Sequence, residues 1–169
     1  MAGVLNDNFC EISAMGVLTT YEPVAATSAV TARDKGIERA TRTFQCLVAA
    51  PNEARRELLL KSVNDAGWDP FVCNEPMQAW AALHRESFQM SVVDLQGSDS
   101  ADFRELCEHL ATQRNMLLMI CGNESAAQEE IWARQLGTWL YLPGVSIDSD
   151  LVTLCTEGRS IAEKLHRTA

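Results

Sequence analysis

The apolar residues of the chain fall into five short runs that alternate with amphipathic stretches. Each run is rich in Val, Leu, Ile, Met or Cys and is followed by Gly, Pro or a polar cluster. A short continuous apolar run is typical of a strand that is covered on both faces of a sheet. The pattern therefore predicts strands at 44–50, 69–73, 88–94, 115–122 and 138–142.

The stretches between these runs carry the spacing and the end signals of helices. Phe103, Leu106, Cys107 and Leu110 stand at i, i+3, i+4 and i+7, which is one face of a helix. The other predicted helices begin at residues that cap a helix or suit its first turn. These signals are Pro51-Asn52, Asn74 with Pro76, Ser125 with capping-box spacing to Gln128, and Asp148 or Ser149.

Five strands that alternate with five helices predict a three-layer, doubly wound α/β domain. The short connections require parallel strands joined by right-handed crossovers, and hence a five-stranded parallel sheet with helices on both faces. This domain is expected to cover 44–166. Residues 1–43 lack a sustained period and are expected to form an N-terminal extension, partly flexible or a docking segment.

Composition restricts the partners and the compartment. The chain has 169 residues and a formal net charge of −9, which opposes nonspecific binding to nucleic acid or to anionic membranes. No apolar run approaches the ~18 residues of a membrane span. The six cysteines form no CxxC pair and lie mostly in apolar runs, as expected of buried, reduced thiols in a cytoplasmic protein.

Asp94 is the first candidate functional residue because it ends the third predicted strand. In open α/β sheets, ligands and chemistry lie in the crevice beyond the carboxyl ends of the strands. A carboxylate at this position has two interpretations. It is either a reactive group, or it is satisfied by the turn amides of Gln96 and Gly97, which is a common role of Asp after a strand.

Residues 44–166 resemble a response-regulator receiver domain of the CheY-like, flavodoxin-like fold. Ser91-Val92-Val93-Asp94-Leu95 resembles the strand that bears the phosphoacceptor aspartate. The other matching segments are Val48 to Leu58, with Arg55 and Leu58 in the usual places, Cys121-Gly122, and Gly137 to Pro143. The resemblance implies a signalling domain that is not an enzyme in its own right.

The sequence departs from the receiver pattern at the residues that perform the chemistry. Ala49 and Ala50 stand where the family has the acidic pair that helps to hold Mg²⁺. Cys121 replaces the family's hydroxyl, and Leu142 replaces the lysine that precedes proline. Methyl groups cannot supply the oxygen ligands that phosphoryl transfer to a carboxylate requires. The resemblance is therefore to a degenerate receiver, in which Asp94 is a vestigial phosphoacceptor.

No cofactor is expected, and Mg²⁺ only if Asp94 is still phosphorylated. Glu53 and Asp94 are the candidate ligands for that ion, with side-chain oxygens of Asn52 or Asn123 or the carboxylate of Asp99 as further donors. A flavodoxin-like domain that binds a small cofactor is an alternative. It would need a Gly-, Ser- or Thr-rich phosphate cradle, which Ala50-Pro51-Asn52-Glu53 does not provide.

The remaining function of a receiver without its chemistry is the recognition of proteins. In receivers, the fourth helix, fifth strand and fifth helix form the usual face for partners or for a homodimer, and here that segment holds Trp132, Trp139 and Tyr141. Trp139 matches the family's switch aromatic, although ordinary core packing also explains it.

The sequence therefore favours a degenerate receiver-like signalling domain that acts by phosphorylation-independent protein–protein interaction. The alternative is a functional or atypical receiver in a two-component phosphorelay, phosphorylated on Asp94. The second alternative is the small-cofactor-binding protein. Neither nucleic acid nor a membrane is an expected partner.

Overall fold

The computed structural model describes residues 44–96, 100–145 and 150–168, and these residues form five strands and five helices in strict alternation. The elements are β1 (Gln45–Ala49), α1 (Glu53–Asp65), β2 (Asp69–Cys73), α2 (Pro76–Leu83), β3 (Met90–Asp94), α3 (Ser100–Ala111), β4 (Leu117–Gly122), α4 (Ala127–Gln135), β5 (Leu140–Pro143) and α5 (Leu151–Thr168). The expectations for 1–43, Gly97, Asp99, Asp148 and Ser149 lie outside the described residues.

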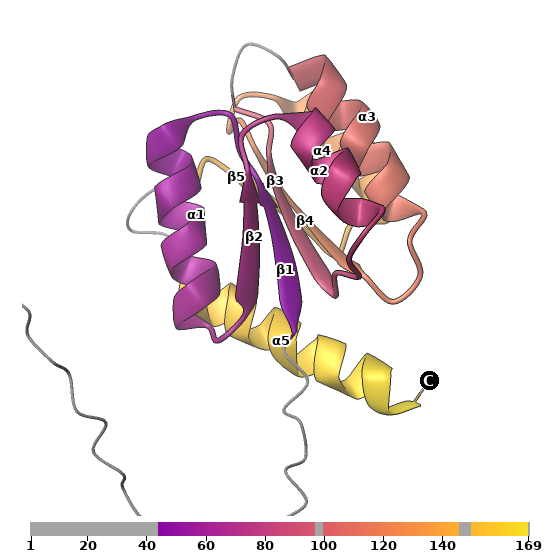
Figure 1. The fold of residues 1–169 in the computed structure, drawn as a ribbon. Helices are drawn as coiled ribbons and strands as arrows, with labels where there is room; N and C mark the ends of the chain where they lie inside the picture. The colour runs from indigo at the N-terminus through magenta and orange to yellow at the C-terminus, as the bar shows by residue number, and fades with distance from the viewer. Residues whose placement is uncertain (1–43, 97–99, 146–149, 169) are drawn as a thin grey trace, which may run out of the picture. The chain divides into compact units, whose positions relative to one another are not determined.

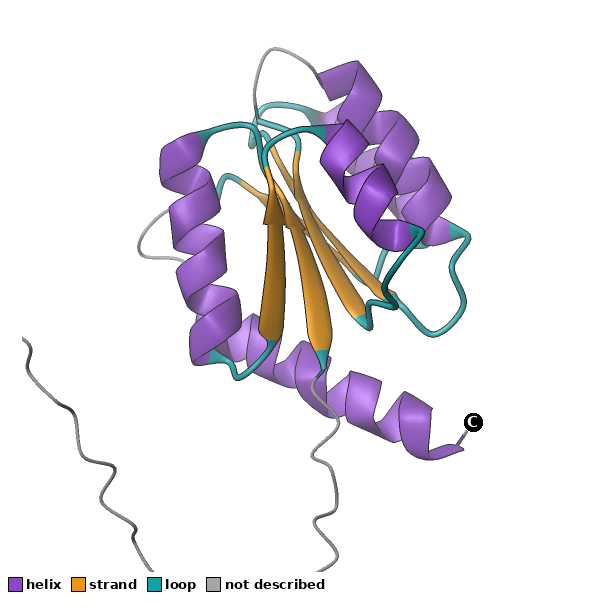
Figure 2. Ribbon diagram, in the orientation of Figure 1, coloured by secondary structure: helices purple, strands orange, loops and turns teal. Residues whose placement is uncertain are grey.

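All five strands are parallel and lie in the order β2-β1-β3-β4-β5 (Figure 1). Helices cover both faces of the sheet, so the domain has the three layers expected from the sequence (Figure 2). This arrangement confirms the predicted doubly wound α/β class. In the described part of the chain, no helix is long and apolar enough to cross a membrane.

Each face of the sheet carries its own apolar core. The core under α1 and α5 includes Leu59, Met90, Met119 and Leu151. The core under α2, α3 and α4 includes Leu47, Phe103, Leu106, Leu110 and Ile120. Because neighbouring residues of a strand point to opposite faces, a strand between two cores must be apolar at every position, which is why the strands read as continuous runs.

The helix caps agree with the sequence at α1 but not at α2 or α4. Asn52 caps α1, and its side chain accepts a hydrogen bond from the Arg55 N–H, as predicted. The prediction that Asn74 caps α2 is wrong, because Glu75 is the N-cap residue and no side chain caps that helix. The capping box at Ser125 is also wrong, because α4 has Ala126 as its N-cap and the Ser125 hydroxyl bonds Asn123 instead.

Alternation along the strands decides which side chains meet at the carboxyl edge of the sheet. In β3, Met90 and Val92 lie in the core under α1 and α5, so Asp94 points to the same side. Ala50, Cys121 and Leu142 also pack in or against that core. The chemistry-bearing positions of the receiver pattern therefore share one side of the sheet edge, with the exception of Ala49, which lies in the opposite core.

The five described cysteines are free and buried, as the sequence predicts, and none of them is paired in a disulfide. They are Cys46, Cys73, Cys107, Cys121 and Cys155. Burial raises the pKa of every one of these thiols, to about 12 for Cys73 and about 11 for Cys155.

Because the thiolate is the reactive form, these five cysteines should resist alkylation in the native protein at about pH 8 and react rapidly in denaturant. Iodoacetamide labelling followed by peptide mass mapping measures each thiol separately. Fast labelling of Cys73 or Cys155 in the native protein would contradict the burial of these side chains.

Candidate functional site

The carboxyl ends of β3, β4 and β5 place three of the candidate residues side by side. Asp94 is the register partner of Cys121, and Cys121 is the register partner of Leu142. Ala49 and Ala50, at the end of β1, are fully buried. The structure therefore brings together the positions that the sequence singled out, and it lines the edge around Asp94 with apolar side chains and a protonated thiol.

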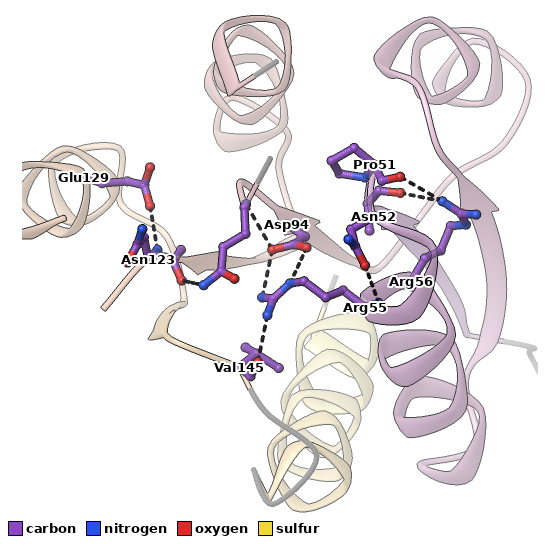
Figure 3. Close-up of polar contacts among 11 residues, drawn as sticks. Pro51, Asn52, Arg55, Arg56, Asp94, Asn123, Glu129 and Val145 are labelled. Carbon is purple, nitrogen blue, oxygen red and sulfur yellow. Dashed lines mark hydrogen bonds and ion pairs between the residues drawn. The ribbon is translucent and has the colours of Figure 1, made fainter. Parts of the chain in front are cut away.

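Asp94 is fully buried, and the Arg55 guanidinium neutralises its charge (Figure 3). The Arg55 Nε donates to Asp94 Oδ2 over 2.6 Å, and the terminal Nη2 donates to Oδ1 over 2.9 Å. This bidentate geometry is the strongest form of a carboxylate–guanidinium pair. The Arg55 side chain is only 17% exposed, so the pair is shielded from water and from salt.

Arg55 also ties a third segment to this pair. Its Nη1 donates to the backbone oxygen of Val145 over 2.7 Å, just after β5. One guanidinium therefore joins the first turn of α1, the end of β3 and the connection that follows β5. Sequence reasoning noted Arg55 as a matching residue but missed this role. The position of Arg55 in the sequence could have revealed this role. It lies three residues after the Asn52 cap, on the helix that follows β1, and β1 is the neighbour of β3 in the sheet.

The Asp94 carboxylate also accepts a hydrogen bond from the turn that follows it. The Gln96 N–H donates to Asp94 Oδ1 over 3.2 Å, which confirms the predicted turn amide at Gln96. The Gln96 side chain extends the link by donating to the Gly122 backbone oxygen over 2.8 Å. Both oxygens of Asp94 thus accept hydrogen bonds, one at Oδ2 and two at Oδ1.

The described residues do not fit a Mg²⁺ site at this edge. A hard cation needs several oxygen ligands, and the two alanines supply none. Glu53 is exposed at the start of α1, the Asn52 amide oxygen caps that helix, and the Asn123 amide oxygen accepts two hydrogen bonds from Ser125. Within the described ranges, no group of three or more His, Cys, Asp or Glu side chains could hold a metal ion.

A second buried carboxylate lies on the opposite face, at the start of α4, and sequence reasoning missed it. Glu129 is 7% exposed and accepts hydrogen bonds from the Arg104 guanidinium at 3.1 Å, the Tyr141 hydroxyl at 3.1 Å and the Asn123 N–H at 3.2 Å. A Cβ at Gly122 would collide with both Tyr141 and Glu129, so the close approach of these side chains depends on that glycine. Glu129 thereby ties α4 to α3, β4 and β5.

The three aromatic candidates lie on two different faces. Trp139 packs against the core under α1 and α5, and a Cβ at Gly158 would lie 3.1 Å from its ring, so its ring rests on α5. Trp132 is half-buried against the other core, with the Arg104 guanidinium 5.2 Å from its ring centroid. Tyr141 lies on the side of Trp132 and bonds Glu129.

Comparison with known proteins identifies the fold. The chain resembles a CheY-like receiver domain protein from Methanospirillum hungatei JF-1 (TM-score 0.61, 12% identity, covering 75% of this chain and 98% of that one). It also resembles the signal receiver domain of an HD domain-containing protein from Pseudomonas fluorescens Pf-5 (TM-score 0.61, 15% identity, covering 75% and 99%). A Francisella response-regulator receiver domain matches with a TM-score of 0.57 and 18% identity, covering 71% and 97%.

No protein-family model matches the chain, and no curated protein sequence matches it. The structural likenesses confirm the resemblance seen in the sequence, and the chain has the CheY-like receiver fold.

Replacing Arg55 by Met should strongly destabilise the protein, because it leaves the Asp94 carboxylate buried without a cation. The expected loss in the free energy of unfolding is about 3 kcal/mol. Arg134→Met is the matched control, since the Arg134–Glu130 pair is exposed (71% and 38%) and should contribute under about 1 kcal/mol. Urea unfolding followed by tryptophan fluorescence measures both, and equal losses would contradict the assigned role of Arg55.

Tyr141 should titrate well above an ordinary tyrosine, because burial and the hydrogen bond to Glu129 raise its pKa to about 12. The folded state holds this proton more tightly than the unfolded state. The resulting stabilisation is complete below the ordinary pKa of 10.0 and is lost as the pH rises towards about 12.

The chain has two tyrosines, so the difference in ultraviolet phenolate titration between the wild type and Tyr141→Phe isolates this group. A difference curve with its midpoint near the ordinary value would show that the hydroxyl is not held by Glu129.

Proposed function

We propose that this chain is a degenerate receiver-like signalling domain, which acts by binding proteins without being phosphorylated and is not an enzyme. The observation that carries the proposal is the Arg55–Asp94 pair. The Arg55 guanidinium neutralises the buried Asp94 carboxylate from within the fold. A receiver in this condition presents one constant surface to its partners.

The chemistry of the site supports this proposal against phosphorylation on Asp94. Attack on an acyl phosphate requires an accessible carboxylate oxygen and a divalent cation to neutralise the charge on the transferred group. Asp94 has no exposed surface, its oxygens accept three hydrogen bonds, and the described residues hold no group of three or more His, Cys, Asp or Glu side chains that could bind a metal ion. Leu142 cannot replace the family's lysine because it carries no charge.

The small-cofactor alternative gains no support from the same edge. The turn between β1 and α1 would have to cradle a phosphate with free backbone N–H groups. At the start of α1, the Asn52 side chain already accepts from the Arg55 N–H, and Pro51 has no N–H to offer.

The proposed contact face for a protein partner, or for a second copy of the chain, is formed by α4, β5 and α5. Ile131 on α4 is 48% exposed, and its neighbour Trp132 is half-buried under the Arg104 guanidinium. Apolar side chains that the core does not absorb are typical of interfaces. Tyr141 on β5 is included in this face because its hydroxyl donates a hydrogen bond to Glu129 on α4. We also propose that residues 1–43 form an N-terminal extension, partly flexible or a docking segment. The proposed location of the protein is the cytoplasm.

The direct test is the intact mass of the protein after incubation with Mg²⁺ and acetyl phosphate, beside an Asp94→Asn control. We expect no phosphoryl adduct. An adduct that disappears in the control would establish the phosphorelay alternative and overturn the proposal.

The same assay on Arg55→Met separates two obstacles to phosphorylation, which are the missing metal ligands and the Arg55 guanidinium bound to Asp94. If the missing metal ligands block the reaction, this variant also stays unmodified, and this is the expected result. An adduct in Arg55→Met but not in the wild type would mean that the guanidinium alone closes the site, and that the domain retains a latent acceptor.

A further inference from the structure

A hollow lies between α2 and α3, away from the proposed α4, β5 and α5 face. Its volume is about 550 Å³. The side chains that decide its character are the apolar Met77, Trp80 and Phe103 and the acidic Glu75, Asp102 and Glu105. We call this surface the α2–α3 groove.

The apolar part of the groove is more exposed than the fold requires. Met77 is 73% exposed, which is the highest value among the large hydrophobic side chains in the described ranges. α2 contributes buried Ala79 and Ala82 and partly buried Trp80 and Leu83 to the core, and Met77 is not among these residues. Trp80 is half-buried, with its ring centroid 4.6 Å from that of His109. An exposed methionine beside a half-buried tryptophan in a hollow is typical of a binding surface.

The rim of the groove carries one sign of charge. Glu75, Asp102 and Glu105 are exposed, and none of them forms an ion pair with another described residue. Among the described residues, no lysine or arginine lines the groove. Glu75 and Asp102 also suit the positive ends of the α2 and α3 dipoles, but Met77 beside them has no such role. The combination indicates a ligand that is both basic and apolar.

We propose that the α2–α3 groove binds a basic amphipathic helix of a partner protein. Apolar side chains on one face of that helix would insert beside Met77 and Trp80, and Lys or Arg side chains would pair with the three carboxylates. A second copy of this chain is a poor occupant of this acidic groove, because it is itself acidic, with 23 Asp and Glu against 14 Lys and Arg. Nucleic acid is excluded for the same reason.

The test uses the full chain and a fluorescent synthetic peptide of about 16 residues, with leucines at i, i+3, i+4 and i+7 and lysines elsewhere. Fluorescence anisotropy measures the Kd for the wild type and for two groove variants, Met77→Asp and Asp102→Lys/Glu105→Lys. We expect each variant to weaken binding by about tenfold or more. A peptide with alanine in place of leucine should bind weakly to every protein.

Two control proteins separate the groove from general attraction to an acidic chain. Glu57→Lys/Asp65→Lys makes the same change in charge at exposed positions on α1, and Ala54→Asp places the same new carboxylate at another exposed position on α1. Both should change the Kd by less than about twofold, and urea unfolding checks that all variants are folded.

Equal weakening in the control and groove variants would overturn the proposal. Unchanged binding in the groove variants would do the same, and so would a dimer in sedimentation experiments that Met77→Asp dissociates.

Discussion

The burial of the Asp94 charge is the constraint on which the carboxyl edge of the sheet depends. A carboxylate with no exposed surface must be neutralised within the fold, because an unpaired buried charge costs several kcal/mol. Arg55 supplies the cation, and its third hydrogen bond reaches the backbone after β5. One ion pair, with the hydrogen bond to Val145, therefore links α1, β3 and the backbone just after β5.

A second network has the same effect on the other face of the sheet. Glu129 draws Arg104, Tyr141 and the turn at Asn123 together around one buried carboxylate. Among the described residues, the buried Arg104 Nε has no hydrogen-bond partner, so this network is less completely paired than the one around Asp94. The two networks engage the two buried carboxylates of the described residues, Asp94 and Glu129, in ion pairs. The features that the fold does not use are found instead on the helical surfaces, where Met77 and Ile131 are exposed.

Most of the fold could be predicted from the sequence because the strands are buried on both faces. Runs such as Leu117 to Cys121 have to be apolar throughout, and the glycines and prolines between elements mark the ends, so five strands and five helices were expected in the right order. The predicted caps at Asn74 and Ser125 are wrong because residues that can cap a helix are common, and only some of them stand where a helix begins. Whether a polar side chain reaches the helix or a neighbour, as Ser125 does with Asn123, is decided by the local turn.

The sequence predicts that Asp94 ends a strand and that Gln96 follows it in a turn, and its resemblance to receivers draws attention to Ala49, Ala50, Cys121 and Leu142. The partners of the buried charges follow from the packing of the helices on the sheet. Arg55 and Asp94 are 39 residues apart, and Arg104 and Glu129 are 25 apart, so no periodic pattern connects them. They meet because the crossovers place α1 over one face of the sheet and α3 and α4 over the other, and the alternation of β3 turns Asp94 towards α1.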